Sequence, residues 1–132
     1  MKFGIDTSVL LRLLVGEPSA TVVKIRERLL EAHRLLAPVT VSDVVIAEAY
    51  YALKYHYALD SAAIRQALLL TLTSGLIRPE ADSPVIEVLH SKISNKAGFV
   101  DRLIQARYER AGLATLTVDR AQSKLGNAQL IR

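Results

Sequence analysis

Short segments with strand character alternate along this chain with longer segments that read as amphipathic helices. The expected strands lie at residues 3–5, 35–37, 76–78, 114–118 and 129–131. The expected helices lie at residues 7–14, 20–34, 44–57, 62–73, 85–93, 99–111 and 120–125. Strands that are joined through helices run parallel to one another. The pattern therefore predicts an α/β fold with a small central parallel sheet and crossover helices.

Composition limits the classes of protein open to this chain. Its 132 residues, 51% of them hydrophobic, suit one domain with a real core, so we expect a single domain over residues 1–132. The absence of cysteine excludes disulfide frameworks, thiolate zinc sites and cysteine nucleophiles. Aromatic residues make up only 5%, which argues against nucleic-acid binding by base stacking. A net charge of +4 modestly favours a polyanionic partner.

The N-terminal segment lacks the apolar run and cleavage site of a secretory signal peptide. The most apolar stretch, residues 39–53, is too short to span a membrane and contains Asp43 and Glu48. We therefore expect a cytoplasmic protein without a membrane partner.

Asp6 stands where the first strand ends and the first helix begins. The α/β proteins place ligand-binding groups at such junctions. Asp6, Thr7 and Ser8 are also ordinary helix-capping residues, so a cap alone would explain this aspartate. Asp119 repeats the arrangement after residues 116–118. Two strands of one parallel sheet that both end in aspartate would bring both carboxylates to the same edge.

Glu48 lies in an apolar helical segment. Its helical neighbours three and four positions away are Val44, Val45, Tyr51 and Ala52, so no cation is within local reach. Such a carboxylate must be exposed on a narrow solvent-facing edge, protonated, paired at long range or bound to a metal.

Asp101 opens another helix, where the helix dipole alone would favour a negative charge. The other acids have structural explanations. Helix starts account for Asp43, Asp60 and Asp82, and solvated faces account for Glu17, Glu27, Glu31, Glu80, Glu87 and Glu109.

A cluster of Asp6, Glu48, Asp101 and Asp119 would need protonation or bound cations to offset the repulsion among its charges. At a separation of about 6 Å and an effective dielectric of about 20, each pair of carboxylates repels by about 3 kcal/mol. With oxygen ligands and no cysteine, the expected cation is Mg²⁺ or Mn²⁺. The sequence does not establish that the four acids converge.

Four blocks of the sequence, in this order and at these separations, resemble the PIN domain, and specifically the VapC-type toxins of toxin–antitoxin pairs. They are FGIDTSVL at residues 3–10, VIAEAYYAL at 45–53, FVDRLI at 99–104 and TLTVDR at 115–120. The resemblance covers essentially the whole chain.

The resemblance implies an α/β/α sandwich on a small parallel sheet, with Asp6, Glu48, Asp101 and Asp119 holding one or two Mg²⁺ ions at its carboxyl edge. It implies that Thr7 or Ser8, and Thr117, orient a ligand by hydrogen bonds. It further implies a Mg²⁺-dependent endoribonuclease that hydrolyses RNA with metal-activated water. A VapB-like antitoxin and a homodimer are the expected partners.

One position departs from the family pattern. Many such proteins carry an aspartate three residues before the position of Asp101, where this chain has Gly98, and this substitution either weakens one metal site or changes nothing.

Several other residues are candidates for contacts. Exposed cations near the acids are expected to bind RNA phosphates or to lie on a solvated face: Arg102, Arg120, Lys124 and Lys96. The three histidines have no ligand spacing, and we expect surface or packing roles for His33, His56 and His90. The tyrosines of residues 50–57 are expected to pack in the core or at a subunit contact rather than to stack on bases.

Two rival functions remain open. The first is a catalytically silent PIN-fold binding module, which would require the loss of an acid, and none is missing. The second is a phosphoacceptor domain with Asp6 as acceptor, which would require a second acid beside Asp6.

Overall fold

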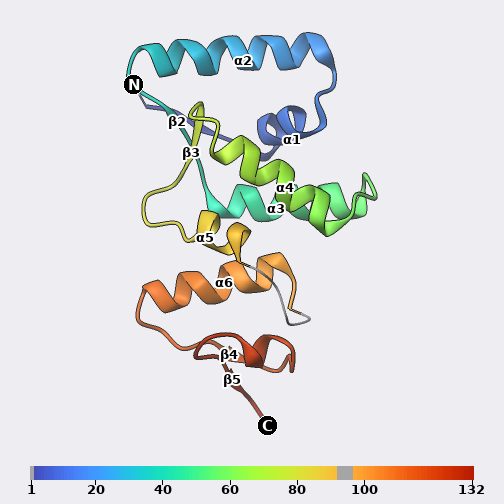
Figure 1. The fold of residues 1–132 in the computed structure, drawn as a ribbon, viewed down its shortest axis with the longest axis vertical. Helices are drawn as coiled ribbons and strands as arrows, with labels where there is room; N and C mark the ends of the chain where they lie inside the picture. Colours follow the sequence, from blue (N-terminus) through green and yellow to red (C-terminus); the bar gives the residue numbers. More distant parts are fainter. Residues whose placement is uncertain (1, 92–96) are drawn as a thin grey trace. The chain divides into compact units, whose positions relative to one another are not determined.

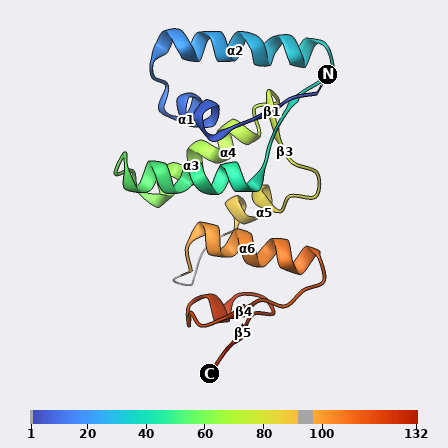
Figure 2. The same cartoon turned by 180° about the vertical axis from the view of Figure 1, so that it is seen from behind.

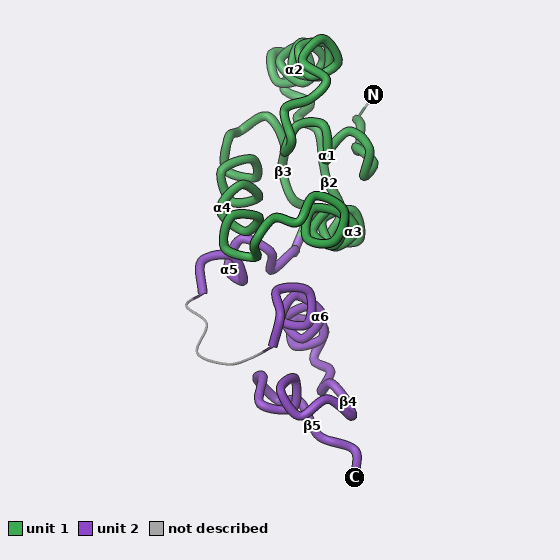
Figure 3. The backbone as a smooth tube through the Cα atoms, turned by 90° about the vertical axis from the view of Figure 1, so that its right-hand side faces the viewer, with its two compact units in different colours: residues 1–81 green, residues 82–132 purple. Residues whose placement is uncertain are grey.

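The structure, a computed structural model, describes residues 2–91 and 97–132 (Figures 1 and 2). The chain forms two compact units, residues 1–81 and residues 82–132 (Figure 3). Among the described residues, no helix is both long and apolar enough to cross a membrane.

Unit 1 is built on a three-stranded parallel sheet. Its elements are β1 (Gly4–Ile5), α1 (Thr7–Val15), α2 (Ser19–Arg34), β2 (Val39–Val41), α3 (Asp43–Tyr55), α4 (Ser61–Leu72) and β3 (Ile77–Pro79). The strand order is β1-β2-β3, with Gly4 opposite Thr40 and Val39 opposite Ile77. Each pair of neighbouring strands is connected through two helices. The expected small parallel sheet with crossover helices is therefore confirmed.

The helices of unit 1 enclose a dry core around the sheet. Helix α1 packs against α2 and α3, and α4 packs against α3 and β3 (Figure 3). The side chains at the centre are at most 1% exposed: Leu10, Val41, Ile46, Leu53, Ile64, Leu68 and Ile77. Leu10 is one turn beyond Asp6, so its burial fixes the start of α1 against the rest of the unit.

Unit 2 contains two helices, a short 3-10 helix and two short strands. They are α5 (Val85–His90), α6 (Phe99–Arg110), β4 (Leu116–Thr117), the 3-10 helix η1 (Gln122–Lys124) and β5 (Gln129–Leu130). Helix α5 packs against α6, and β4 pairs with β5 in parallel, with Leu116 opposite Gln129. Val85, Phe99 and Leu103 are at most 2% exposed.

The second strand differs from the prediction. Residues 35–37 were expected to form it, but the strand is Val39–Val41. The backbone N–H groups of Leu35, Leu36 and Ala37 are all donated back to carbonyl groups at the end of α2, and Leu36 has a positive φ of 56°. These residues therefore form the C-terminal end of α2, and their backbone N–H groups are not available to pair with a neighbouring strand.

The strands that precede Asp6 and Asp119 do not belong to one hydrogen-bonded sheet. Strand β1 belongs to the three-stranded sheet of unit 1, whereas β4 pairs only with β5 among the described residues. The expectation of one sheet with both carboxylates at its edge is therefore wrong. The two aspartates nonetheless share a similar local setting, between a strand and a helical turn.

Candidate active site

Asp6 caps α1 and stays fully exposed. Its Oδ1 accepts hydrogen bonds from the Ser8 hydroxyl at 2.6 Å and from the backbone N–H of Val9 at 3.1 Å. The Ser8 hydrogen bond, followed by that of Val9, lowers the pKa of Asp6 below its ordinary value. Asp6 can therefore cap the helix and still bind a ligand, because the capping hydrogen bonds keep its carboxylate ionised while the side chain is exposed to solvent.

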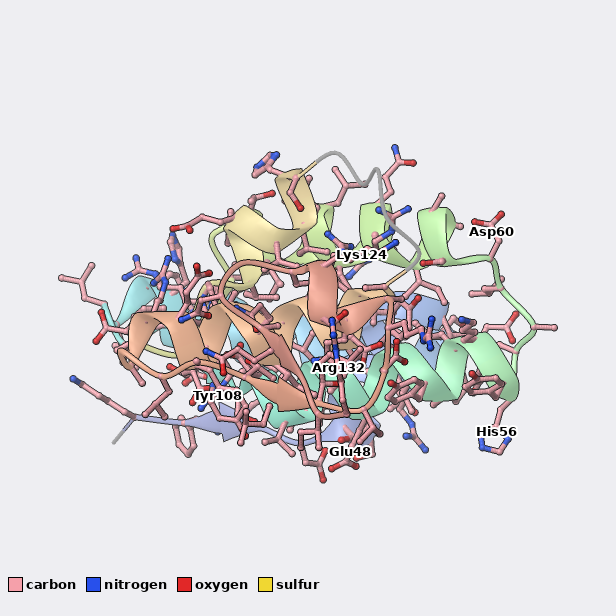
Figure 4. The ribbon with its side chains drawn as sticks, turned by 90° about the horizontal axis from the view of Figure 1, so that it is seen from below. Glu48, His56, Asp60, Tyr108, Lys124 and Arg132 are labelled. Atoms are coloured by element: carbon pink, nitrogen blue, oxygen red, sulfur yellow. The ribbon has the colours of Figure 1, made fainter. Side chains whose placement is uncertain are left out.

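Glu48 is held beside this junction by the residue that follows Asp6. The Thr7 hydroxyl donates to Glu48 Oε2 at 3.2 Å, across 41 positions of sequence. Glu48 is exposed, so the solvent-facing interpretation is correct, and it also has a long-range partner. The label in Figure 4 marks Glu48 on α3. Two consecutive hydroxyls, on Thr7 and Ser8, thus contact two carboxylates from different elements.

Two further acids lie at the carboxyl ends of β2 and β3. Glu80 follows β3, and its Oε1 accepts the backbone N–H of Asp43 at 2.9 Å. Asp43 is 3% exposed, and Ser42 rather than Asp43 caps α3 by accepting from Val45 at 3.2 Å. Glu80 was expected to lie on a solvated face. Instead, its side chain helps hold the N-terminus of α3.

Asp119 in unit 2 repeats the capping pattern of Asp6. Its Oδ1 accepts the backbone N–H groups of Ala121 at 2.7 Å and Gln122 at 3.1 Å. The Thr117 hydroxyl accepts the backbone N–H of Asp119 at 3.0 Å. Thr117 thus fixes the backbone of the aspartate rather than its carboxylate, which is exposed.

Asp101 lies in the first turn of α6 and is half-buried. Within residues 2–91 and 97–132 its carboxylate accepts no hydrogen bond, whereas its carbonyl accepts the Gln122 side-chain amide at 3.4 Å. Gln122 therefore connects the backbone of Asp101 to the carboxylate of Asp119. Sequence reasoning missed Gln122, and the only signal was its place three residues after Asp119, where a capped N–H is expected.

The cations expected to bind RNA fall into three groups. Arg120 and Lys124 are exposed in unit 2. Arg102 is buried, and its Nη1 donates to the Val88 carbonyl at 3.3 Å and to the Ser91 hydroxyl at 2.9 Å, so it ties α6 to α5 instead of facing solvent. Lys96 lies outside the described residues.

The histidines take the expected surface positions. His33, His56 and His90 are all exposed and lie at or just beyond the ends of helices. Figure 4 shows His56 projecting outward beyond α3.

Each unit contributes two of the four acids, Asp6 and Glu48 from unit 1 and Asp101 and Asp119 from unit 2. Among the described residues of either unit taken alone, no three carboxylate or imidazole groups gather into a metal-binding cluster. A site of four acids therefore requires both units. Their convergence remains a prediction.

The family model of the PIN domain matches residues 4–128. The chain belongs to the PIN domain family. Members of this family are generally nucleases and typically use divalent metals. The match spans both units and all four acids, from Asp6 in β1–α1 to Asp119 after β4. No curated protein and no solved structure matches the chain.

The donor set of this PIN domain suits a divalent metal of the hard class. All four candidate ligands are carboxylates, and Mg²⁺ and Mn²⁺ prefer such oxygen donors. The lowered pKa keeps Asp6 in the ionised form that a metal requires. The residues present therefore fit the metal that the family implies.

Proposed function

We propose that this PIN domain is a Mg²⁺-dependent endoribonuclease, with Asp6, Glu48, Asp101 and Asp119 as metal ligands and Mn²⁺ as an effective substitute. The observation that carries the proposal is that the consecutive hydroxyls of Thr7 and Ser8 contact Glu48 and Asp6, respectively, in a chain of a nuclease family. Each hydroxyl contacts one oxygen of its carboxylate and both acid side chains are exposed, so oxygen donors remain for a cation.

The residues of the chain prepare this site. The bound cation supplies a water of lowered pKa and neutralises charge on the leaving oxygen of the phosphodiester. Ser8 and Thr7 hold the carboxylates of Asp6 and Glu48 in fixed orientations. In unit 2, the backbone N–H groups of Ala121 and Gln122 hold the Asp119 carboxylate, and Thr117 fixes the backbone of Asp119.

Exposed cations then hold the RNA. Arg120 directly follows Asp119, and Lys124 ends η1, so both can contact phosphates on either side of the scissile bond. Lys96 is a third candidate by sequence alone. Arg102 is not part of this proposal, because its guanidinium is buried.

We further propose that the enzyme is the toxin of a type II toxin–antitoxin pair, acts in the cytoplasm as a homodimer, and is inhibited by a VapB-like antitoxin. Unit 1 contains an apolar groove of about 370 Å³ between α2, β1 and β2. Phe3, Ile25 and Leu29 line it, together with the charged residues Lys24, Arg28 and Glu31. An apolar antitoxin segment with acidic flanks fits this groove. Ile25→Glu should abolish inhibition by the antitoxin while leaving RNA cleavage intact.

The decisive test replaces one ligand by its closest isostere. Asp6→Asn keeps a good helix cap but removes the charge, so the protein should fold while cleavage of RNA falls by at least about 100-fold. Asp60 is the matched control, since it caps α4 in the same way by accepting from Ala63 at 2.8 Å. Asp60→Asn should cleave RNA like the wild type.

Metal titration separates this enzyme from the silent binding module. The wild type should bind Mn²⁺ with a stoichiometry of one or two and lose cleavage in EDTA, and Asp6→Asn should bind the metal more weakly. Cleavage that is indifferent to EDTA, or full activity of Asp6→Asn, would overturn the proposed mechanism. RNA binding without metal binding would favour the silent module.

A further inference from the structure

The low aromatic content of this chain argues against base stacking in general, but most of its aromatic residues are concentrated on or just after one helix. Four of its five tyrosines lie within residues 50–57, on α3 or just after it, and α3 also carries Glu48. Tyr50 is 3% exposed and its hydroxyl lies 2.7 Å from that of Ser61, so it packs in the core as expected. Tyr51 and Tyr55 are different, because 43% and 69% of their surfaces are exposed.

The two exposed rings form an ordered pair. Tyr51 and Tyr55 are stacked, with ring centroids 6.0 Å apart and an interplanar angle of 18°. Tyr50 contacts Tyr51 edge-on, with ring centroids 5.7 Å apart and an interplanar angle of 75°, so the buried ring packs against the exposed pair. Positions 48, 51 and 55 follow one face of a helix, so the stacked pair continues the face on which the Glu48 carboxylate lies.

Positive charge accompanies these rings. The Lys54 ammonium lies 5.7 Å from the centroid of Tyr55 and 5.9 Å from that of Tyr50. Arg12 is exposed on α1, which packs against α3, and with Tyr57 it lines a hollow of about 170 Å³. Stacked, solvent-facing aromatic rings beside cations are the arrangement that binds single-stranded nucleic acid, because every base has a face that can stack.

We propose that Tyr51 and Tyr55 form a stacking platform that positions unpaired bases of the RNA substrate, with Lys54 and Arg12 holding the adjacent phosphates. The inference rests on the proposed nuclease function and deepens it, because it names the residues that bind the unpaired bases of the substrate. A duplex keeps its bases stacked on one another and offers none to the platform. The charged groups along this face, Glu48 and Lys54, disfavour a second protein chain as its occupant, since charges are depleted at the centre of protein interfaces.

The test measures binding of a fluorescein-labelled 12-nucleotide RNA by anisotropy, in EDTA so that no cleavage occurs. Tyr55→Ala and Tyr51→Ala should each raise Kd about five-fold or more, the effect expected for one stacked base. Tyr55→Phe should restore binding to within about two-fold of the wild type. Lys54→Gln should weaken binding for all sequences and reduce the slope of log K against log salt by about 0.7.

The matched control is Tyr108→Ala. Tyr108 is 43% exposed, the same as Tyr51, but among the described residues it stacks on no other ring, so its replacement should leave Kd unchanged. Duplex RNA of the same sequence should bind more weakly than the single strand and should be indifferent to both tyrosine substitutions.

Two results would overturn the platform. One is unchanged binding of single-stranded RNA by Tyr51→Ala and Tyr55→Ala. The other is a change of oligomeric state in sedimentation with the affinity per chain preserved, which would make this face a contact between copies. Failure of the proposed nuclease function would give a different result. RNA binding that depends on the two tyrosines, without any cleavage in Mg²⁺ or Mn²⁺, would support the stacking platform and contradict the nuclease function.

Discussion

Asp6 and Asp119 begin from the same local pattern and are supported in different ways. Both follow a strand and cap the turn after it. In unit 1 the turn grows into the nine-residue helix α1, and the hydroxyl of Thr7 reaches Glu48 on another helix. In unit 2 the turn leads into a three-residue 3-10 helix, and the link from Asp119 to Asp101 passes through the Gln122 side chain.

This difference shows how firmly the acid side chains of each unit are held in the proposed site. In unit 1, hydroxyl groups contact the carboxylates directly, and Leu10 anchors the helix in the core one turn later. In unit 2, two backbone N–H groups hold the Asp119 carboxylate, whereas the Asp101 carboxylate accepts no hydrogen bond among the described residues, so the Asp101 side chain keeps more freedom. We expect unit 1 to be preorganised for a metal and unit 2 to be ordered further by the metal itself.

The largest expected effect comes from removing an acid of unit 2. Asp101→Asn and Asp119→Asn should each lower the rate of RNA cleavage by at least about 100-fold, as should Asp6→Asn in unit 1, if the two units complete one metal site. Single-turnover cleavage in Mg²⁺ measures this. Full activity of both unit 2 variants would confine the site to unit 1.

The next effect concerns the stability of the two units. Leu10→Ala and Leu103→Ala remove buried side chains, 0% and 2% exposed, and each should cost about 2–5 kcal/mol of unfolding free energy. Urea unfolding followed by circular dichroism measures both. Leu70→Ala, 66% exposed on α4, is the control and should change stability by less than about 0.5 kcal/mol.

The same unfolding curves test the expectation of one domain over residues 1–132. A single transition that moves in both core variants would support it. Two separate transitions, each sensitive to only one variant, would mean that the two units fold independently.

A smaller effect is expected for the residues that orient the acids. Thr7→Val removes the hydroxyl that contacts Glu48 at similar volume and should weaken Mn²⁺ binding about 10–100-fold. Gln122→Met should weaken it less, because Gln122 contacts the backbone of Asp101 and not its carboxylate. Calorimetric titration compares the two, and an equal loss in both would contradict the proposed difference between the units.

The smallest effect concerns the titration of Asp6. Because the Ser8 hydrogen bond lowers the pKa of Asp6, its carboxylate stays ionised as the pH falls below the ordinary value, and protonation occurs only as the pH passes the folded-state pKa. Ser8→Ala should raise this pKa and so move the acid limb of metal binding to higher pH. Carbon-13 NMR of the Asp6 carboxyl group measures it, with Ser123→Ala as control, since Ser123 donates to the Arg120 carbonyl instead.

Much of the fold and part of the site could be predicted from local pattern. Periodicity and capping residues placed most of the helices within a few residues, because those signals are local. The second strand was misplaced because Leu35 and Leu36 look like a strand but close the end of α2 with backbone hydrogen bonds. The single sheet was wrong because strand pairing is a long-range choice that two or three residues cannot specify.

The sequence by itself determined that this chain is a PIN domain, and that Asp6 and Asp119 follow strands and begin turns. Only the tertiary structure decided that Thr7 contacts Glu48, that Gln122 links Asp101 to Asp119, that Arg102 is buried, and that Tyr51 and Tyr55 stack in solvent. The physical reason is the range of the interaction. Caps and periodicity act within one turn, whereas hydrogen bonds between side chains and exposure depend on which distant segments meet.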